Sequence, residues 1–373
     1  MSHDPRFLES CEREQLHRSG AIQPHGTLLV AAPDGLVTHA GANTDAWLGM
    51  PPETVIGRAL PTGLDRLMLE LGGDEGTRIS RYLQSVGTRV LTVVATRAAD
   101  GSAILECTAA EPGPGLRIPD SPGGIPHTDD ELTARREHLV RTVAALTGFS
   151  RVLFYRFRDD ADGEVVSEVA AEGTTGSYLG LRFPASDVPQ IARALYVKNP
   201  WRLIPDVAAA PVTLLGAAGS ATPDLTYSDL RSVSPVHQAY LANMGVGASL
   251  SVPVVRRGAL DALITAHHAV ARDVSVATMT QVSRAVKAYT TSLLMFEAQR
   301  RMRLVDNLTV RYGDVPARLP VIDQHWNDLA PRLAADFEAD GVTFSWGARR
   351  LAWGTTGPAE VESYLAPWIE RQR

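Results

Sequence analysis

A stretch rich in proline and glycine, EPGPGLRIPDSPGGIPHTDD at residues 111–130, constrains the fold of this chain more than any other feature. Proline lacks a backbone N–H donor and keeps the residue before it out of the helical region, so a regular helix or strand cannot run through such a stretch. The chain has 373 residues, which is enough for two or three domains. We therefore expect a linker over 111–130 with a folded domain on either side.

The part before the linker reads as a small α+β domain over residues 21–110, preceded by a polar segment, 1–20. Two apolar runs in GTLLVAAPDGLVTHAG flank Pro33-Asp34-Gly35, which is a typical turn signal. The runs RVLTVVA and AILECTA indicate further strands.

The part after the linker predicts a second α+β domain over residues 131–300. A helix is expected from about Asp130 to Gly148, since its apolar residues recur at helical spacing. GASLSVPVV at 247–255 and LDALITAHH at 260–268 indicate strands that flank a turn. A long helix follows, ending at Leu304 or Leu308, with one apolar stripe: Val282, Val286, Tyr289, Leu293 and Phe296. The stretch 208–223 predicts a long loop, and residues 301–373 look too short for a complete third domain.

The composition excludes several classes of function. The net charge is −6, which gives no electrostatic footprint for nucleic acid, and no run of 18 apolar residues could span a membrane. The polar start of the chain lacks the apolar core of a secretory signal, so we expect a cytoplasmic protein without nucleic-acid or membrane partners. A P-loop, an HExxH helix and a GxSxG elbow are all missing, so we expect neither an enzyme nor a metal site.

Two cysteines are too few for a disulfide framework or a four-thiolate zinc site. Cys107 lies between apolar neighbours in ILECTAA and is expected to be buried in a strand. Cys11 lies in the polar segment ESCEREQ. This local sequence alone leaves two alternatives open for Cys11, a spare surface thiol or a functional nucleophile.

Several polar residues are ambiguous when read singly. Ser186 or Asp187, before a helical run, would serve as a helix N-cap. Arg202 and Arg231 would be ordinary surface charges. His267 and His268 are adjacent on a predicted strand and must face opposite ways, so one is expected to face a core or cavity and the other solvent.

Four segments, taken together and in order, resemble the signatures of bacterial phytochromes. They are CEREQLHRSGAIQPHGTLLV, GSYLGLRFPASDVPQIARALY, LRSVSPVHQAYLANMGVGASLSV and LDALITAHH. The second resembles the PASDIP segment of the family, with Val188 in place of the usual isoleucine. The resemblance is close over residues 1–300 and looser over 301–373.

The resemblance implies an α+β fold in which a PAS domain (21–110) precedes a GAF domain (131–300), each an antiparallel sheet with helices. The N-terminal segment is expected to thread through a GAF loop near 208–230, with Ile22 as the threaded residue. Such a figure-of-eight knot is a rare exception to unknotted chains. Residues 301–373 resemble the opening of a PHY domain, without the arm that in complete relatives reaches back to the chromophore.

The resemblance also implies the pigment. Plant and many cyanobacterial relatives attach reduced bilins through a cysteine at the position of Val236, whereas biliverdin-binding bacterial members use the N-terminal cysteine. Cys11 is therefore expected to bind biliverdin IXα through a thioether. A thiolate is the natural nucleophile for the vinyl-type side chain of the A ring.

The remaining site residues are carried over from the family motifs. The two propionates are expected to meet cations and hydroxyls, namely those of Tyr196, Arg202, Arg231, Ser249 and Ser251. The pyrrole and D-ring contacts are expected from Asp187, Val188, Pro189, His237 and His267, and the aromatic walls from Tyr155, Phe183 and Tyr240.

Besides Val188, the chain departs from the family at two further places. Asp261-Ala262 stands where Trp-Gly is usual, and Ala266 where cysteine is usual. An aspartate is unusual in a buried strand, so we expect altered packing or altered dimer contacts there.

The function implied is a red/far-red photoreceptor module that converts Z/E isomerisation of biliverdin into a conformational signal. The apolar stripe of the long GAF helix indicates either a homodimer face or a contact within the chain. The alternative function is a GAF-type sensor of another ligand, such as a cyclic nucleotide or haem.

Overall fold

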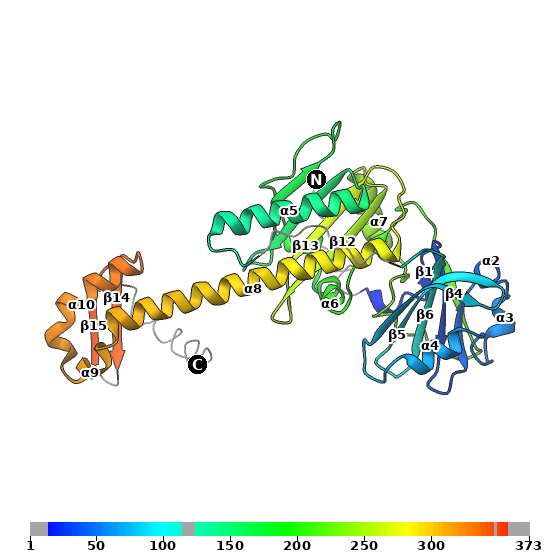
Figure 1. Ribbon diagram of the computed structural model, residues 1–373, viewed down its shortest axis with the longest axis horizontal. Helices are drawn as coiled ribbons and strands as arrows, with labels where there is room; N and C mark the ends of the chain where they lie inside the picture. Colours follow the sequence, from blue (N-terminus) through cyan, green and yellow to red (C-terminus); the bar gives the residue numbers. More distant parts are fainter. Residues whose placement is uncertain (1–13, 114–123, 347–348, 357–373) are drawn as a thin grey trace. The chain divides into compact units, whose positions relative to one another are not determined.

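The computed structural model describes residues 14–113, 124–346 and 349–356, and it divides into two compact units, 1–297 and 298–373. The first unit contains two antiparallel sheets, and the second contains a helical segment with a hairpin (Figure 1). The predicted attachment residue Cys11 and the middle of the predicted linker lie outside the described residues.

The first sheet has seven strands, with α2 (Thr44–Leu48), α3 (Pro52–Val55) and α4 (Leu64–Glu70) packed against it. Cys107 is fully buried among these apolar residues, which confirms its predicted place in a strand. In spatial order the strands are β1 (Ala21–Ile22), β11 (Val212–Gly216), β3 (Val37–Gly41), β2 (Gly26–Ala31), β6 (Ala103–Ala109), β5 (Arg89–Arg97) and β4 (Arg78–Val86).

One strand of this sheet comes from the second half of the chain, where the sequence predicted only a loop. β11 lies inside the 208–223 stretch and pairs with β3 on one side and β1 on the other. The prediction of an unbroken loop was therefore wrong. The reason is that the partners of β11 are about 170 to 190 residues away in sequence, so local pattern does not reveal them.

The segment around Ile22 is enclosed on both sides by residues 208–232, which we call the threaded insertion. On one side Ala21 and Ile22 pair with Thr213 and Val212. On the other side the amide of Gln23 donates to the carbonyl of Leu230 at 2.7 Å. Ile22 itself has no exposed surface. The arrangement is the one expected when the N-terminal segment threads the loop.

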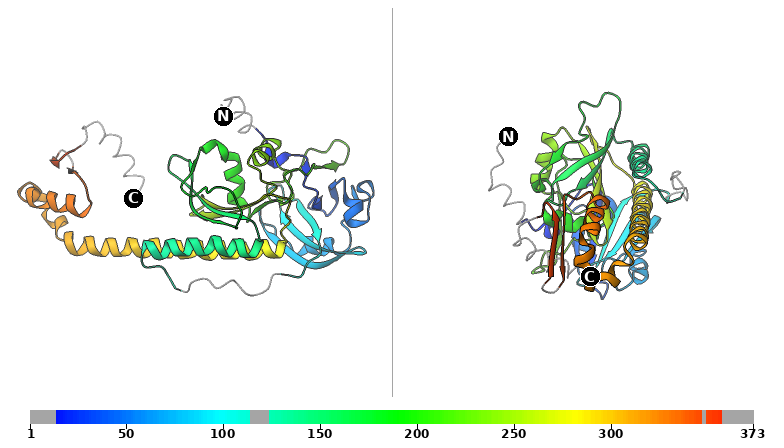
Figure 2. Two further views of the ribbon diagram at one scale, coloured as in Figure 1. Left: turned by 90° about the horizontal axis from the view of Figure 1, so that it is seen from above. Right: turned by 90° about the vertical axis from the view of Figure 1, so that its left-hand side faces the viewer.

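The second sheet has six strands, with long helices on one face and α6 (Gln190–Lys198) on the other (Figures 1 and 2). α5 (Asp129–Thr147) and α8 (Val276–Tyr312) lie side by side on the first face. In spatial order the strands are β10 (Arg202–Ile204), β12 (Ala248–Arg256), β13 (Ala259–His268), β7 (Arg151–Phe157), β8 (Gly163–Ala170) and β9 (Arg182–Phe183).

Helix α5 begins and ends where the sequence indicated. The hydroxyl of Thr128 accepts a hydrogen bond from the amide of Glu131, whose carboxylate accepts one from the amide of His127. This reciprocal pair satisfies two amides that have no partner within the helix. Gly148 ends the helix in the left-handed conformation, with φ of 65°.

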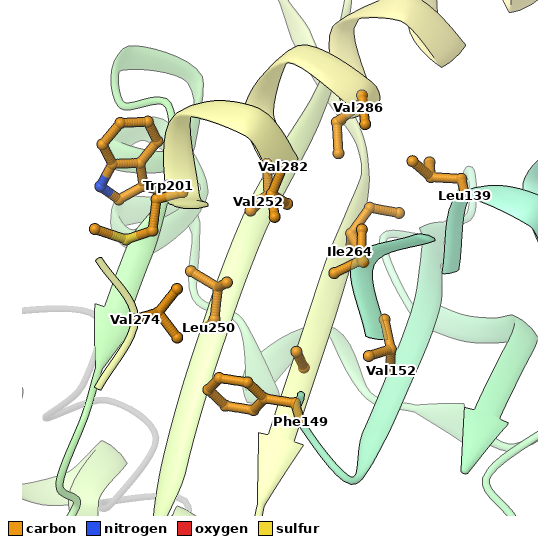
Figure 3. Close-up of a cluster of buried hydrophobic side chains, with 14 of the residues drawn as sticks. Leu139, Phe149, Val152, Trp201, Leu250, Val252, Ile264, Val274, Val282 and Val286 are labelled. Atoms are coloured by element: carbon orange, nitrogen blue, oxygen red, sulfur yellow. The ribbon is translucent and has the colours of Figure 1, made fainter. Parts of the chain in front are cut away.

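The stripe on α8 faces the core of its own domain. Val282 and Val286 pack with residues of β7, β12 and β13, including Ile264 (Figure 3). Tyr289 belongs to the same core, and its ring centroid lies 5.5 Å from that of Phe154. The interpretation of this stripe as a dimer face is therefore wrong, and the alternative of a contact within the chain is confirmed. The helix also continues beyond the predicted end, to Tyr312.

The second unit packs a small core around α10 (Ile322–Asp336), with α9 (Val315–Arg318) and the 3₁₀ turn Leu319–Val321 before it. Trp326 lies at its centre and donates from its indole nitrogen to the carbonyl of Ala352 at 3.1 Å. The hairpin consists of β14 (Gly341–Trp346) and β15 (Arg349–Gly354). None of the helices in the described ranges has the length and apolarity needed to cross a membrane.

Candidate functional site

A cavity with two lobes lies on the face of the second sheet that α5 and α8 leave uncovered. The first lobe has a volume of about 180 Å³ and the second about 90 Å³. Side chains alternate between the faces of a strand, so Val152 and Phe154 face the helices while Leu153 and Tyr155 face the cavity side. The lobes are contiguous because they share five lining residues: Asp187, Val188, Tyr196, His237 and Tyr240.

All the described site residues expected from the sequence line this cavity. Pro189, Arg202 and Arg231 line the first lobe with the shared residues. The second lobe is lined by the shared residues together with Tyr155, Phe183, Ser249, Ser251 and His267. The hydroxyls of Ser249 and Ser251 therefore lie in a different lobe from the two arginines, although Ser251 is the β-sheet partner of Arg202.

Two arginines give the first lobe a positive wall. Arg202, from β10, donates to the carbonyls of Asp229, Arg231 and Ser232 at 3.1, 2.6 and 3.0 Å. Arg231 donates to the carbonyls of Leu225 and Thr226 at 3.1 and 3.2 Å. A guanidinium has five N–H donors, so these partners leave two donors on Arg202 and three on Arg231. The interpretation of both residues as ordinary surface charges is wrong.

Burial sets the energetics of this pair. Burial and then the neighbouring charge of Arg202 lower the pKa of Arg231 to about 9. Burial also lowers the pKa of Arg202. Both side chains remain charged at neutral pH, and two like charges in a poorly solvated site favour an anionic ligand.

The second lobe is aromatic, with one carboxylate at its border. The ring centroids of Tyr155 and Phe183 are 5.9 Å apart, and Tyr178 packs on Phe183 at 6.2 Å. Tyr240, from α7 (Pro235–Asn243), donates its hydroxyl to Asp187 at 2.9 Å. Helix α6 begins at Gln190 without a side-chain cap, so the alternative of Ser186 or Asp187 as its N-cap is wrong.

Two neutral histidines lie between these walls. The ring of His237 stacks on Tyr240, with centroids 6.1 Å apart. Burial lowers the pKa of both His237 and His267 to about 4. Nδ1 of His267 is buried and has no hydrogen-bond partner among the described residues. His268 faces the other way, and its Nδ1 accepts from the amide of Ser150 at 3.2 Å, as the alternation of a strand requires.

The N-terminal segment reaches the first lobe through two residues that the sequence analysis did not name. Glu14 and Leu16 line it, and the carboxylate of Glu14 accepts a hydrogen bond from the hydroxyl of Ser234 at 2.6 Å. Cys11 precedes Glu14 by three residues, which limits the distance between their Cα atoms to about 11 Å. Val236 lines the same lobe, so the position used by plant relatives carries no thiol here.

Family models and curated relatives match most of the chain. A PAS fold model matches residues 11–71 and a GAF domain model residues 131–287. A bacteriophytochrome of Pseudomonas aeruginosa is 37% identical over 285 residues, which cover 71% of this chain and 38% of the relative. A bacteriophytochrome of Xanthomonas campestris is 32% identical, covering 99% of this chain and 61% of the relative. The chain thus spans less than two thirds of the length of these relatives.

Solved structures extend the match. The chromophore-binding domain of Stigmatella aurantiaca bacteriophytochrome is 32% identical, with a TM-score of 0.64, covering 76% of this chain and 99% of that domain. A photosensory core module of a phytochrome from the same organism is 28% identical, with a TM-score of 0.76, covering 96% of this chain and 75% of that module.

Proposed function

Since this chain belongs to the bacteriophytochrome family, we propose that it is a red/far-red photosensory module that holds biliverdin in the two-lobed cavity. The observation that carries the proposal is the buried pair Arg202 and Arg231, which lies beside neutral histidines in a cavity with an aromatic second lobe. That combination fits a flat, apolar ligand with two carboxylates. Haem also carries two carboxylates, so this pair does not separate it from biliverdin. Membership of the bacteriophytochrome family is what argues against haem or a cyclic nucleotide.

Each part of biliverdin finds a matching wall. Guanidinium groups bind carboxylates through paired N–H donors, so Arg202 and Arg231 are assigned to the propionates, with Tyr196, Ser249 and Ser251 as hydroxyl partners. A neutral imidazole has one acceptor and one donor nitrogen. His237 can therefore accept from pyrrole N–H groups, while His267 can donate to the D-ring carbonyl.

Covalent attachment is assigned to Cys11. Its reach to the first lobe follows from the position of Glu14 at the lobe wall. The thiolate adds to the vinyl-type side chain of the A ring and a proton completes the adduct, so the thioether forms without an external reagent. This attachment is the one reaction that we assign to the module, and it occurs once for each molecule.

The photochemistry is assigned to the second lobe. Light isomerises the bilin from Z to E by rotating the D ring, so its surroundings must be apolar and adaptable. Tyr155, Phe183 and Tyr240 supply such a wall. Asp187 lies where it can exchange its bond from Tyr240 for other partners as the ring turns.

A homodimer and a cytoplasmic location complete the proposal. The buried stripe of α8 cannot serve as the interface, but other apolar residues of this helix are exposed, including Met295, Met302 and Leu304. We assign the dimer contact to them. Light scattering on Leu304→Glu, with the buried-stripe contacts left intact, should show a monomer if this assignment holds.

An absorption spectrum tests the central proposal. Purified protein mixed with biliverdin should gain a red band that changes reversibly under alternating red and far-red light. Haem and cyclic nucleotides serve as comparison ligands in the same titration. Binding of one of these without a red band from biliverdin would favour the alternative sensor.

A further inference from the structure

A buried carboxylate outside the cavity is connected to both arginines of the first lobe through residues 228 and 229. Glu106 lies on β6 of the first sheet, pairs in register with Leu28 and Val94, and is 2% exposed. It lines neither lobe. Burying a carboxylate is unfavourable unless its oxygens are fully hydrogen-bonded, so its partners show what it does.

Those partners all belong to one limb of the threaded insertion, residues 228–232. One carboxylate oxygen accepts from the hydroxyl of Ser228 at 2.6 Å and from the amide of Leu230 at 2.7 Å. The other oxygen accepts from the amide of Asp229 at 3.1 Å. The limb therefore turns around the carboxylate of Glu106.

A second residue of the first sheet holds the same limb. Arg78, from β4, binds the side chain of Asp229 through both terminal nitrogens, one of them at 3.1 Å. Its guanidinium also lies over the ring of Trp201, 4.7 Å from the centroid. The limb is thus fixed by an anion and a cation of the PAS domain.

The limb in turn fixes the two arginines. The backbone carbonyl of Asp229 accepts from Arg202 at 3.1 Å. The hydroxyl of Ser228 accepts from the amide of Arg231 at 2.9 Å while it donates to Glu106. Arg202 therefore binds the carbonyl of a residue whose amide Glu106 holds, and the backbone of Arg231 binds the Ser228 hydroxyl that Glu106 also holds.

We propose that Glu106 is a positioning residue of the PAS domain that orients Arg202 and Arg231 for the propionates of the pigment. The inference rests on the proposed function and names the part of the first sheet that shapes the pocket. Burial, followed by the charge of Asp229, raises the pKa of Glu106 to about 7. Burying a carboxyl group is unfavourable, and apolar residues would hold the two sheets together equally well. A specific role therefore explains Glu106 better than adhesion between the sheets.

The test compares two ligands that differ only in the propionates. Biliverdin and its dimethyl ester are titrated into the 373-residue chain carrying Cys11→Ser, so that binding is reversible, and the quenching of tryptophan fluorescence is followed. In Glu106→Gln a side-chain NH₂ replaces one carboxylate oxygen and faces a backbone N–H. Two donors then meet, so at least one hydrogen bond to the limb is lost. Loss of a charge-assisted bond predicts an about tenfold rise in the half-saturating concentration of biliverdin. The ester should change by less than about twofold, because it has no carboxylate for the arginines.

Controls separate this role from general damage. Glu70→Gln makes the same replacement at an exposed PAS residue that pairs with Arg81, and it should leave both titrations unchanged. Arg78→Lys keeps the charge but loses the bidentate geometry, and it should weaken biliverdin selectively and by a smaller factor. If Glu106→Gln does not fold, Arg78→Lys decides. Equal losses for both ligands, or no loss, would overturn the inference. Failure of the parent protein to bind biliverdin would instead reject the proposed function.

Discussion

Burial determines the chemical state of the cavity residues before any ligand enters. The same desolvation that keeps His237 and His267 neutral leaves Arg202 and Arg231 charged, because their unperturbed pKa values differ by about six units. The cavity therefore offers cations at one end and neutral donor–acceptor groups in the middle. A ligand with carboxylates and pyrrole nitrogens uses both.

The two cysteines should respond differently to replacement. Cys11→Ser is expected to abolish covalent pigment, whereas Cys107→Ser is not. Cys107 is fully buried, and burial raises the pKa of its thiol to about 12, so it has almost no thiolate at neutral pH. Zinc-induced fluorescence of the denatured protein on a gel reports the adduct. A fluorescent band from the Cys11 variant would contradict the assignment.

Asp187 should control photoconversion more than binding. Its carboxylate accepts from Tyr240 and lies at the border of both lobes, whereas Arg202 and Arg231 line the first lobe alone. Asp187→His is expected to take up biliverdin but to switch poorly and fluoresce more, since blocked isomerisation leaves emission as a larger decay route. Difference spectra and quantum yields measure this. Wild-type switching in the variant would count against the role.

The neutral histidines predict a loss of stability in acid. Their pKa is about 4 in the folded state against about 6.5 when unfolded, so between these values the unfolded chain binds more protons. The contribution of the two neutral histidines to the free energy of unfolding is fully present above about pH 6.5 and is lost as the pH falls toward 4. From pH 7 to pH 5 each histidine should cost about 2 kcal/mol in the protein without pigment.

Denaturant unfolding at several pH values measures this slope. His237→Gln and His267→Gln should each flatten it, because the replaced group no longer titrates. His268→Gln is the matched control, since His268 lies on the opposite face of β13 and is far less enclosed. An equal effect from all three variants would assign the slope to something other than the cavity.

The sequence could predict the roles of cavity residues only where a motif or an alternation marks them. Thr265 also lines the second lobe, and its spacing of two residues from Leu263 and His267 on one strand could have revealed it. Glu106 could not be found in this way. Its one signal is a charge inside the apolar run ILECTAA, and its partners are more than 120 residues away.

At the scale of elements, Gly163 shows how a strand makes room for a cavity wall. It begins β8, and a Cβ placed on it would lie 1.7 Å from Cζ of Tyr155. Gly163→Ala should therefore push the Tyr155 ring out of position and destabilise the fold by about 1–3 kcal/mol. The red band of the pigment should shift or weaken as well. Gly73→Ala provides a control in an open loop, with nothing within 4 Å of the added atom and a backbone conformation that alanine adopts without strain. Unchanged stability and an unchanged spectrum in Gly163→Ala would contradict this packing.

Regular elements with their own periodicity were predicted well, and elements defined by distant partners were not. Local sequence alone predicts the α5 caps, the β12–β13 hairpin and the start of the α8 stripe. β11 is not, since its five residues gain their order from β1 and β3. Asp261, expected to disturb a buried strand, pairs instead with Arg256, which also binds Glu297 of α8.

At the scale of the whole molecule, the threaded segment explains how the first sheet is held to the part of the chain that lines the cavity. β1 lies between strand β11 and the 228–232 limb, so the first sheet cannot move away from the insertion without breaking both contacts. The resemblance to a known family was needed to predict this, because hydrophobic periodicity carries no signal for a knot. The expected domain boundaries within 1–300 stay predictions.

The last prediction concerns the light product of the 373-residue chain. Every lining residue of both lobes lies between Glu14 and His267, within the first unit, and Phe183, Asp187 and Tyr240 are only half-buried. Leu179 and Leu181, next to this lobe, are 59% and 46% exposed. Water therefore reaches the region where the turned D ring must find new partners, and hydrogen bonds weaken when water competes for them. The dark state relies on the buried arginines and histidines and should be normal, whereas the light product should be incomplete or bleached and should revert quickly in darkness. The measurement is the difference spectrum after saturating red light, followed in the dark. A full, long-lived far-red band would show that residues 298–373 or a second copy of the chain already exclude water from the second lobe.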